Sequence, residues 1–170
     1  AVQAGLSSAH VLFVDDVDRA AFERAGWMIR QGVQFHWEQD LATPMQTFGD
    51  LLLRLQRDKR KKIQQERRKV ADAGVSFSVH EGASITAAQW DFFHHCYTLT
   101  YEAHHSTPYL TRDFFSRMAH TMPQHWLLFV AHQGDEPIAC SLIAIDAEQR
   151  SAWGRYWGAT RYVPCLHFEA

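Results

Sequence analysis

The sequence of 170 residues has few of the features that mark secreted proteins or membrane proteins. Its three cysteines, Cys96, Cys140 and Cys165, are odd in number and lack the paired spacing of a disulfide framework or a metal site. No apolar run approaches the roughly 18–20 residues that cross a bilayer, and no basic-then-apolar leader begins the chain. These absences predict a cytoplasmic protein without a membrane span.

Motifs for the commonest catalytic chemistries are also absent. The 11 histidines include no HExxH motif, and adjacent pairs such as His94-His95 would point about 100° apart on a helix. There is no GxSxG turn, and Cys96 within an aromatic helical segment is typical of a small core residue. The sequence therefore predicts no metal and gives no support for covalent catalysis.

What is present is the composition of a globular protein. Hydrophobic residues make up 46% and charged residues 21%, and a formal net charge of −2 selects no class of partner. The length suits one domain of ordinary size. Because residue 1 is Ala and the chain stops directly after an aromatic motif, we expect a piece of a longer protein.

The hydrophobic pattern predicts an α/β architecture of the α+β kind. Helices are expected over 15–24, 45–73, 86–104 and 112–120, and strands over 10–14, 27–37 (a broken pair), 75–79, 126–132, 137–145 and 151–157. The last three strands follow one another closely, with a turn at 133–136 between the first two of them. This order indicates a β-meander flanked by helices and not a parallel doubly wound sheet.

Basic residues are concentrated in the long helix. Nine of the 17 Lys and Arg residues lie between Arg54 and Lys69, where two acidic residues oppose them, so this stretch carries +7 and the remainder −9. Helical spacing places Arg57, Lys61 and Arg68 opposite the apolar stripe, on a solvated face. The stretch has no interleaved aromatic residues for stacking on bases, so an anionic small molecule or phosphate-bearing carrier fits it better than direct nucleic-acid binding.

Lys59 and Glu66 differ from the other charges because helical spacing places both near the centre of the apolar stripe. A charge there must be paired, extend to water, or line a polar cleft. Two interpretations stay open. Such a charge is held in a structural ion pair within the domain, or it lines a cleft where Lys59, Arg60 or Lys62 meets a phosphate or carboxylate.

Several segments together resemble one known family. They are the basic segment from Lys59 to Val70 followed by Gly74-Val75, the Gly154-Arg155-Tyr156-Trp157-Gly158 run after Trp153, and the closing Leu166-His167-Phe168-Glu169. These motifs resemble those of the Fem-like bacterial proteins of peptidoglycan biosynthesis or recognition, which belong to the GNAT superfamily of N-acyltransferases. The resemblance runs from about Phe35 to Glu169.

The resemblance implies a two-domain organisation. Residues 1–38 would be the end of a first GNAT-like domain, and residues 39–170 the N-terminal part of a second, whose GNAT-like mixed sheet is incomplete at the C-terminus. The helix expected after His167-Phe168-Glu169 could hold the pyrophosphate of coenzyme A on its free backbone N–H groups. We therefore expect this piece alone to be inactive.

The function implied is transfer of an acyl or aminoacyl group from acyl-CoA or aminoacyl-tRNA to an amine, linked to cell-wall precursors. For catalysis the candidates are Glu169, His167 and Tyr156. For substrate binding they are Lys59, Arg60, Arg67, Arg155, Tyr101 and Tyr109. The alternative is a non-catalytic module that recognises an anionic cell-wall precursor or a partner protein. The sequence names neither the donor nor the acceptor.

Overall fold

The computed structural model describes residues 5, 7–33 and 35–168, apart from the side chain of Arg155, and it divides the chain into two compact units. The first unit ends at Gln46 and the second begins at Thr47. The predicted division at residue 38, and the assignment of both parts to GNAT-like domains, stay predictions.

The first unit contains one helix, α1 (Asp16–Arg24). Asp15 caps it by accepting a 2.8 Å hydrogen bond from the backbone N–H of Asp18. Gly26, at φ +75°, lies just past its end, as the sequence predicts. The ring of Phe22 packs on Trp27 with centroids 4.9 Å apart. No described residue of this unit is fully buried, so its packing is loose.

The strands predicted over 10–14 and 27–37 are wrong. The described residues of both segments form no strand. Their apolar residues are largely exposed, among them Leu12 (74%) and Phe35 (97%). A strand requires a neighbour for its backbone hydrogen bonds, and the pattern of apolar residues alone does not supply one.

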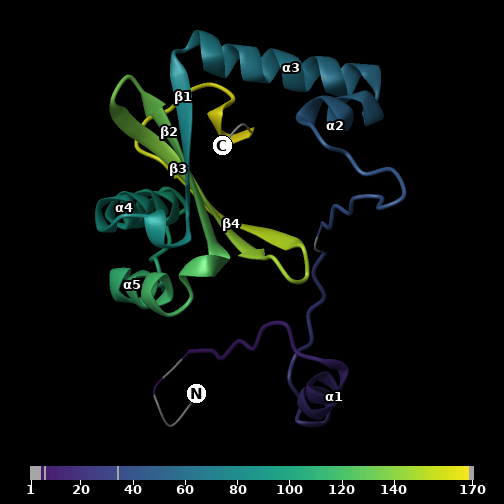
Figure 1. Cartoon of the computed structure of the whole chain (residues 1–170). Helices are drawn as coiled ribbons and strands as arrows, with labels where there is room; N and C mark the ends of the chain where they lie inside the picture. The colour runs from purple at the N-terminus through teal and green to yellow at the C-terminus, as the bar shows by residue number, and fades with distance from the viewer. Residues whose placement is uncertain (1–4, 6, 34, 169–170) are drawn as a thin grey trace. The chain divides into compact units, whose positions relative to one another are not determined.

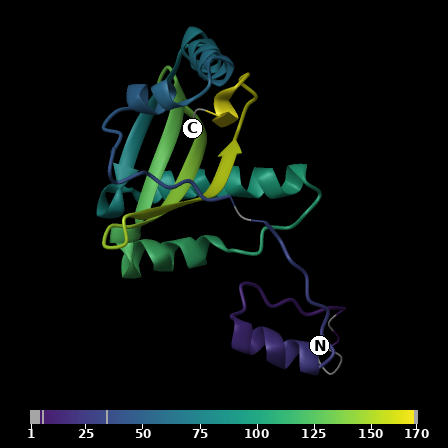
Figure 2. The ribbon, with the colours of Figure 1, turned by 90° about the vertical axis from the view of Figure 1, so that its right-hand side faces the viewer.

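The second unit is built on a four-stranded antiparallel sheet of order β1-β2-β3-β4. The strands are β1 (Val75–Glu81), β2 (Trp126–Gln133), β3 (Glu136–Asp146) and β4 (Ser151–Ala159). Strands β2 to β4 form the predicted meander, with Gly134 at φ +62° in the first turn, and β1 pairs with β2 (Figures 1 and 2). The predicted α/β class with a meander is confirmed.

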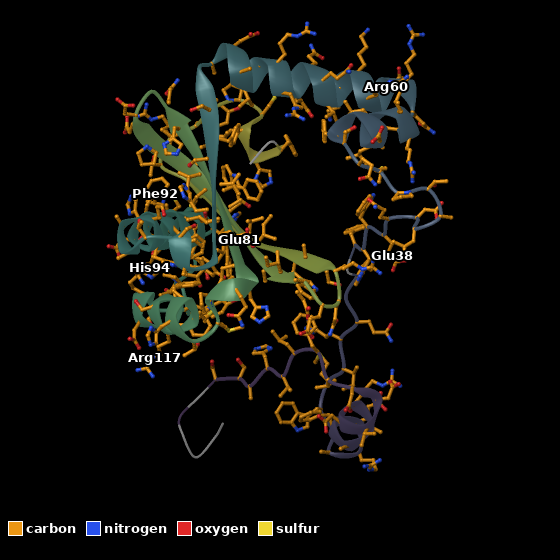
Figure 3. All side chains as sticks on the ribbon, in the orientation of Figure 1. Glu38, Arg60, Glu81, Phe92, His94 and Arg117 are labelled. Carbon is orange, nitrogen blue, oxygen red and sulfur yellow. The ribbon has the colours of Figure 1, made fainter. Side chains whose placement is uncertain are left out.

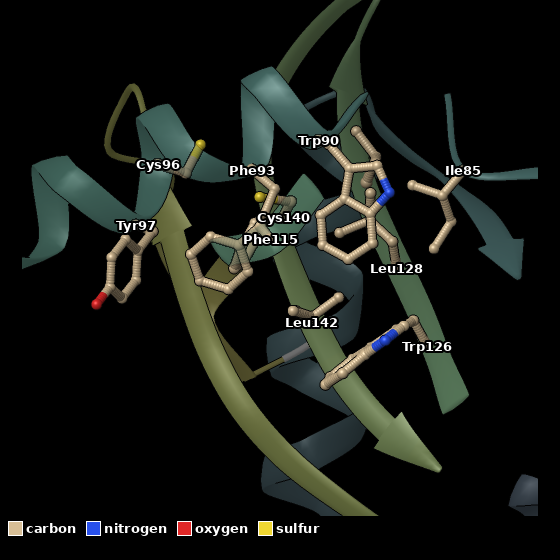
Figure 4. Close-up of a cluster of buried hydrophobic side chains, with 11 residues drawn as sticks. Ile85, Trp90, Phe93, Cys96, Tyr97, Phe115, Trp126, Leu128, Cys140 and Leu142 are labelled. Atoms are coloured by element: carbon tan, nitrogen blue, oxygen red, sulfur yellow. The ribbon is translucent and has the colours of Figure 1, made fainter. Parts of the chain in front are cut away.

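One face of the sheet, here named the aromatic face, carries Leu128, Leu142 and Tyr156 in register across β2, β3 and β4. Helices α4 (Ala87–Ala103) and α5 (Arg112–Thr121) cover it (Figure 1). Their N-caps are Thr86 and Thr111, whose side chains accept hydrogen bonds from the backbone N–H groups of Gln89 and Phe114. The core between these layers contains large aromatic side chains, most of them fully buried (Figure 4): Trp90, Phe93, Tyr97, Phe115 and Trp126.

The opposite face, here named the α3 face, carries Ala131, Ala139 and Trp157. Helix α3 (Arg57–Asp72) and the C-terminal segment pack on it through a smaller core that includes Val70 and Leu166. Figure 2 shows the C-terminal segment lying beside α3. Val70 is the one fully buried residue of α3, so this helix is attached mainly through its C-terminal half.

The single helix predicted over 45–73 is two helices, α2 (Phe48–Arg54) and α3. The extended backbone of Leu55, with ψ 151°, separates the two helices. Thr47 and Asp50 form a capping box at the start of α2, whereas Gln56 makes no side-chain cap for α3. Within the described residues, no helix combines the length and apolar character needed to span a bilayer.

Gly158 fixes the distance between β4 and α4. A Cβ atom at this position would lie 2.3 Å from the carbonyl oxygen of Cys96, which is closer than any real contact. The Thr100 hydroxyl also bridges the two elements, since it lies 3.1 Å from the Cys96 carbonyl oxygen and 3.0 Å from that of Trp157. The last residue of the Gly154–Gly158 motif therefore has a packing role.

Candidate functional site

A pocket of about 480 Å³ opens where α2, α3 and the short turn Leu166–Phe168 meet. Its lining consists of Phe48, Ile63, Glu66, Arg67 and Phe168. Phe48 and Phe168 are 44% and 73% exposed, so apolar surface in this pocket is available to a ligand.

Charged groups of both signs line this pocket. The Arg67 guanidinium lies over the Phe48 ring, 4.3 Å from its centroid, and this contact orients it. Glu66 is largely covered and pairs with Lys62 at 3.7 Å, one helical turn earlier. The cationic Arg67 side chain, held against an aromatic ring, is suited to an anionic group such as a phosphate or carboxylate.

Three aromatic rings connect the pocket to the sheet. Phe168 packs on His167 with centroids 5.4 Å apart, and His167 packs edge-on to Trp157 at 4.7 Å. The Trp157 indole Nε1 is buried and makes no hydrogen bond to any described group. His167 itself is exposed, so its imidazole is accessible to solvent or to a ligand.

A second group of polar aromatic side chains lies at the aromatic face. The ring of Tyr101 packs on those of Tyr97 and Tyr109, at 4.7 and 5.6 Å. Burial, followed by hydrogen bonds with Tyr109 and Tyr97, raises the pKa of Tyr101 well above its ordinary value of 10. The Tyr97 hydroxyl also accepts a hydrogen bond from the backbone N–H of Leu110 at 3.3 Å. These contacts tie the end of α4 to the following loop.

A family model for peptidoglycan biosynthesis/recognition, FemAB-like, matches residues 1–170. The chain belongs to the FemAB-like family. A search of curated proteins finds no match. The family supports a role in peptidoglycan-related biosynthesis or recognition, and it extends over both compact units.

The structure distributes the predicted residues of this FemAB-like chain over both faces of the sheet. Arg67 lines the pocket. His167 does not line it, but the next residue, Phe168, does. Tyr156 contacts Phe93, Tyr97 and Phe115 on the aromatic face, opposite the side on which Trp157 meets His167. The other predicted catalytic residue, Glu169, and the side chain of Arg155 lie outside the described part. Their roles stay predictions.

The placement predicted for Lys59 is wrong. This residue is exposed, whereas Glu66 is partly buried as expected. Lys59 lies on the side of α3 that faces inward. The first turn of the helix extends beyond the small core that buries Val70, so Lys59 stays uncovered there. Glu66 pairs with Lys62 and not with Lys59. Arg60, partly buried on the same side as Ile63, lies in the part of α3 next to α2 (Figure 3).

The sequence analysis missed a polar network at the edge of the sheet. Ser78 Oγ lies 2.9 Å from His80 Nε2 and 2.8 Å from His132 Nε2, and the Gln89 amide nitrogen lies 2.9 Å from His80 Nε2. The alternation of Ser78 and His80 within a predicted strand was the available signal. The pairing with His132 required the strand register. Among the described residues, no group of three His, Cys, Asp or Glu side chains is placed to hold a metal ion.

Proposed function

We propose that this FemAB-like protein transfers an acyl or aminoacyl group from a carrier to an amine of a peptidoglycan-related substrate. The observation that supports the proposal is the pocket in which Arg67, held over Phe48, faces the same cavity as Phe168. The next residue back, His167, is exposed beside it. A cation thus lines the pocket, and an exposed imidazole precedes Phe168, a residue that also lines it.

The chemistry requires few groups from the protein. The amine nitrogen attacks the carbonyl carbon of the acyl group, the bond from that carbon to the carrier breaks, and the amine loses a proton to a base. His167 is the candidate base among the described residues. Arg67 and Arg60 would bind the phosphates of acyl-CoA or aminoacyl-tRNA, because guanidinium groups match phosphate oxygens in geometry and charge.

The test has a binding arm and a transfer arm. Calorimetry of the full-length protein with a UDP-linked muropeptide and with acyl-CoA is compared between wild type, Arg67→Gln and the control Lys61→Gln, whose charge lies on the exposed outer face of α3. We expect Arg67→Gln to weaken binding about tenfold or more, the value of one charged hydrogen bond. Lys61→Gln should bind as wild type does.

Transfer is followed by mass spectrometry of the acceptor with acyl-CoA or aminoacyl-tRNA as donor. His167→Gln should lower the rate by about 10²-fold or more and leave acceptor binding unchanged, as expected for a lost base. No transfer from either donor contradicts the proposal.

The second candidate function is recognition without catalysis. It is favoured by the separation of Tyr156 from His167 on opposite faces of the sheet. Muropeptide binding that depends on Arg67, in a protein that transfers nothing, would support recognition over transfer.

A further inference from the structure

The outer side of α3 carries a row of cations. Arg57, Lys61 and Arg68 are all exposed and recur at helical spacing, on the side opposite Val70. Nitrogen-tipped side chains along α3 point away from the sheet in Figure 3. The whole helix contains eight basic and three acidic residues. Within the second unit, this helix therefore carries eight of the 14 Lys and Arg residues.

The three cations of the row form no ion pair within the described part of the chain, and the acidic Asp72 lies on the same side, one helical turn after Arg68. There, α3 contributes one ion pair, between Lys62 and Glu66, and none to the three residues of the row. The Lys62–Glu66 pair lies toward the pocket side of the helix, where Glu66 is one of the lining residues. Charges with no internal partner attract an external anion.

The shape of this surface favours a flat partner. A straight helix of 16 residues is about 24 Å long, so several cations along one side of it can contact a flat surface at the same time. No aromatic side chain belongs to α3, so bases have no platform to stack on.

We propose that the row of Arg57, Lys61 and Arg68 docks the protein on an anionic phospholipid surface. Each basic side chain near such a surface contributes roughly a fivefold gain in affinity. The acidic excess elsewhere does not cancel this gain, because charges more than about 10 Å from the surface are screened at 0.1 M salt. This docking does not depend on which group the protein transfers or recognises.

The experiment measures co-sedimentation of the 170-residue chain with vesicles of phosphatidylglycerol and phosphatidylcholine, and with vesicles of phosphatidylcholine alone. The variant Lys61→Glu/Arg68→Glu is compared with the control Arg24→Glu/Arg30→Glu, which changes net charge equally at exposed positions outside α3. We expect the α3 variant to bind anionic vesicles about 25-fold more weakly or worse, from two lost charges. The control should stay close to wild type.

Three further readings decide the outcome. Binding to neutral vesicles should be weak, and raising the salt to about 1 M should abolish binding to anionic ones, because the screening length falls to about 3 Å. Circular dichroism should show that both double variants stay folded, since all four residues are exposed. Equal binding of wild type and the α3 variant, or tighter binding to duplex RNA than to anionic vesicles, overturns the proposal.

Discussion

The two faces of the sheet differ in how they are covered. Large rings fill the space between the aromatic face and helices α4 and α5, with Phe93, Tyr97 and Phe115 at most 1% exposed. On the α3 face, the helix buries Val70 alone, and the pocket beside it exposes Phe48 and Phe168. One face is closed by packing, and the other presents charge and apolar surface to solvent.

This difference separates stability from binding. Buried aromatic rings contribute most to folding, because each removes a large apolar area from water. On the α3 face, Arg67 and His167 are exposed and Glu66 is partly buried, so we expect substitutions there to cost the fold little. The following predictions test this separation, beginning with the largest effect.

Phe115→Ala should be the most destabilising substitution. Phe115 is fully buried and contacts Phe93, Tyr97 and Tyr156, so its loss leaves a cavity and should cost about 3–5 kcal/mol of the free energy of unfolding. The matched control on the other face, Phe168→Ala, removes a ring that is 73% exposed and should cost under about 1 kcal/mol. Urea unfolding measures both, and equal costs would contradict the separation.

Gly158→Ala should destabilise by about 2–3 kcal/mol, because its methyl group would force β4 away from the Cys96 carbonyl on α4. Gly154→Ala, in the same strand, has nothing within 4 Å of the added Cβ and should change stability by less than about 0.5 kcal/mol. Thermal unfolding of the two variants decides this. If both glycines tolerate alanine equally, the close approach of β4 to α4 does not limit packing.

The alkaline stability should depend on Tyr101. Burial and hydrogen bonds with Tyr109 and Tyr97 raise its pKa in the folded state, so above pH 10 the unfolded chain loses this proton first. Stability is therefore fully present below pH 10 and falls as pH rises beyond it, by less than the limit of about 1.4 kcal/mol per pH unit for one proton, because Tyr101 is only partly buried. Tyr101→Phe should flatten this loss in urea unfolding across that range. The control Tyr162→Phe, at an 88% exposed position, should not.

The ion pair of Lys62 and Glu66 should have the smallest effect. Lys62 is 68% exposed, the pair spans 3.7 Å, and Lys precedes Glu, which is the weaker order on a helix. Lys62→Gln should therefore cost less than about 0.5 kcal/mol in urea unfolding. Lys61→Gln is the control without an ion pair, and a cost above 1 kcal/mol for Lys62→Gln alone would show that the α3 face relies on this pair.

Most of the second unit could be predicted from the sequence. The helices expected over 86–104 and 112–120 are α4 and α5, each preceded by a threonine cap, and Gln89 completes the capping box at the start of α4. These signals are local, because a cap or a turn glycine acts within a few residues. The same local reasoning failed where a partner was needed, as at residues 10–14, and where extended backbone at Leu55 divides the long helix.

The candidate site was less predictable. Arg67 and His167 were identified by resemblance, but the contact of Arg67 with Phe48 follows from the turn between α2 and α3. The alternation of a strand could have separated Tyr156 from Trp157, since consecutive side chains point to opposite faces. The network of Ser78, His80 and His132 joins residues 54 positions apart and depends on strand register.

By itself, the sequence determined the family, the α/β class, the meander and the position of the basic segment, because motifs, caps and periodicity are properties of neighbouring residues. The tertiary structure alone decided which charges are buried, which rings meet and where a pocket opens. Lys59 and Glu66 show the reason: helical spacing places both on the inward side of α3, but only Glu66, one turn before the buried Val70, is partly covered. Burial depends on what another part of the chain brings to that place.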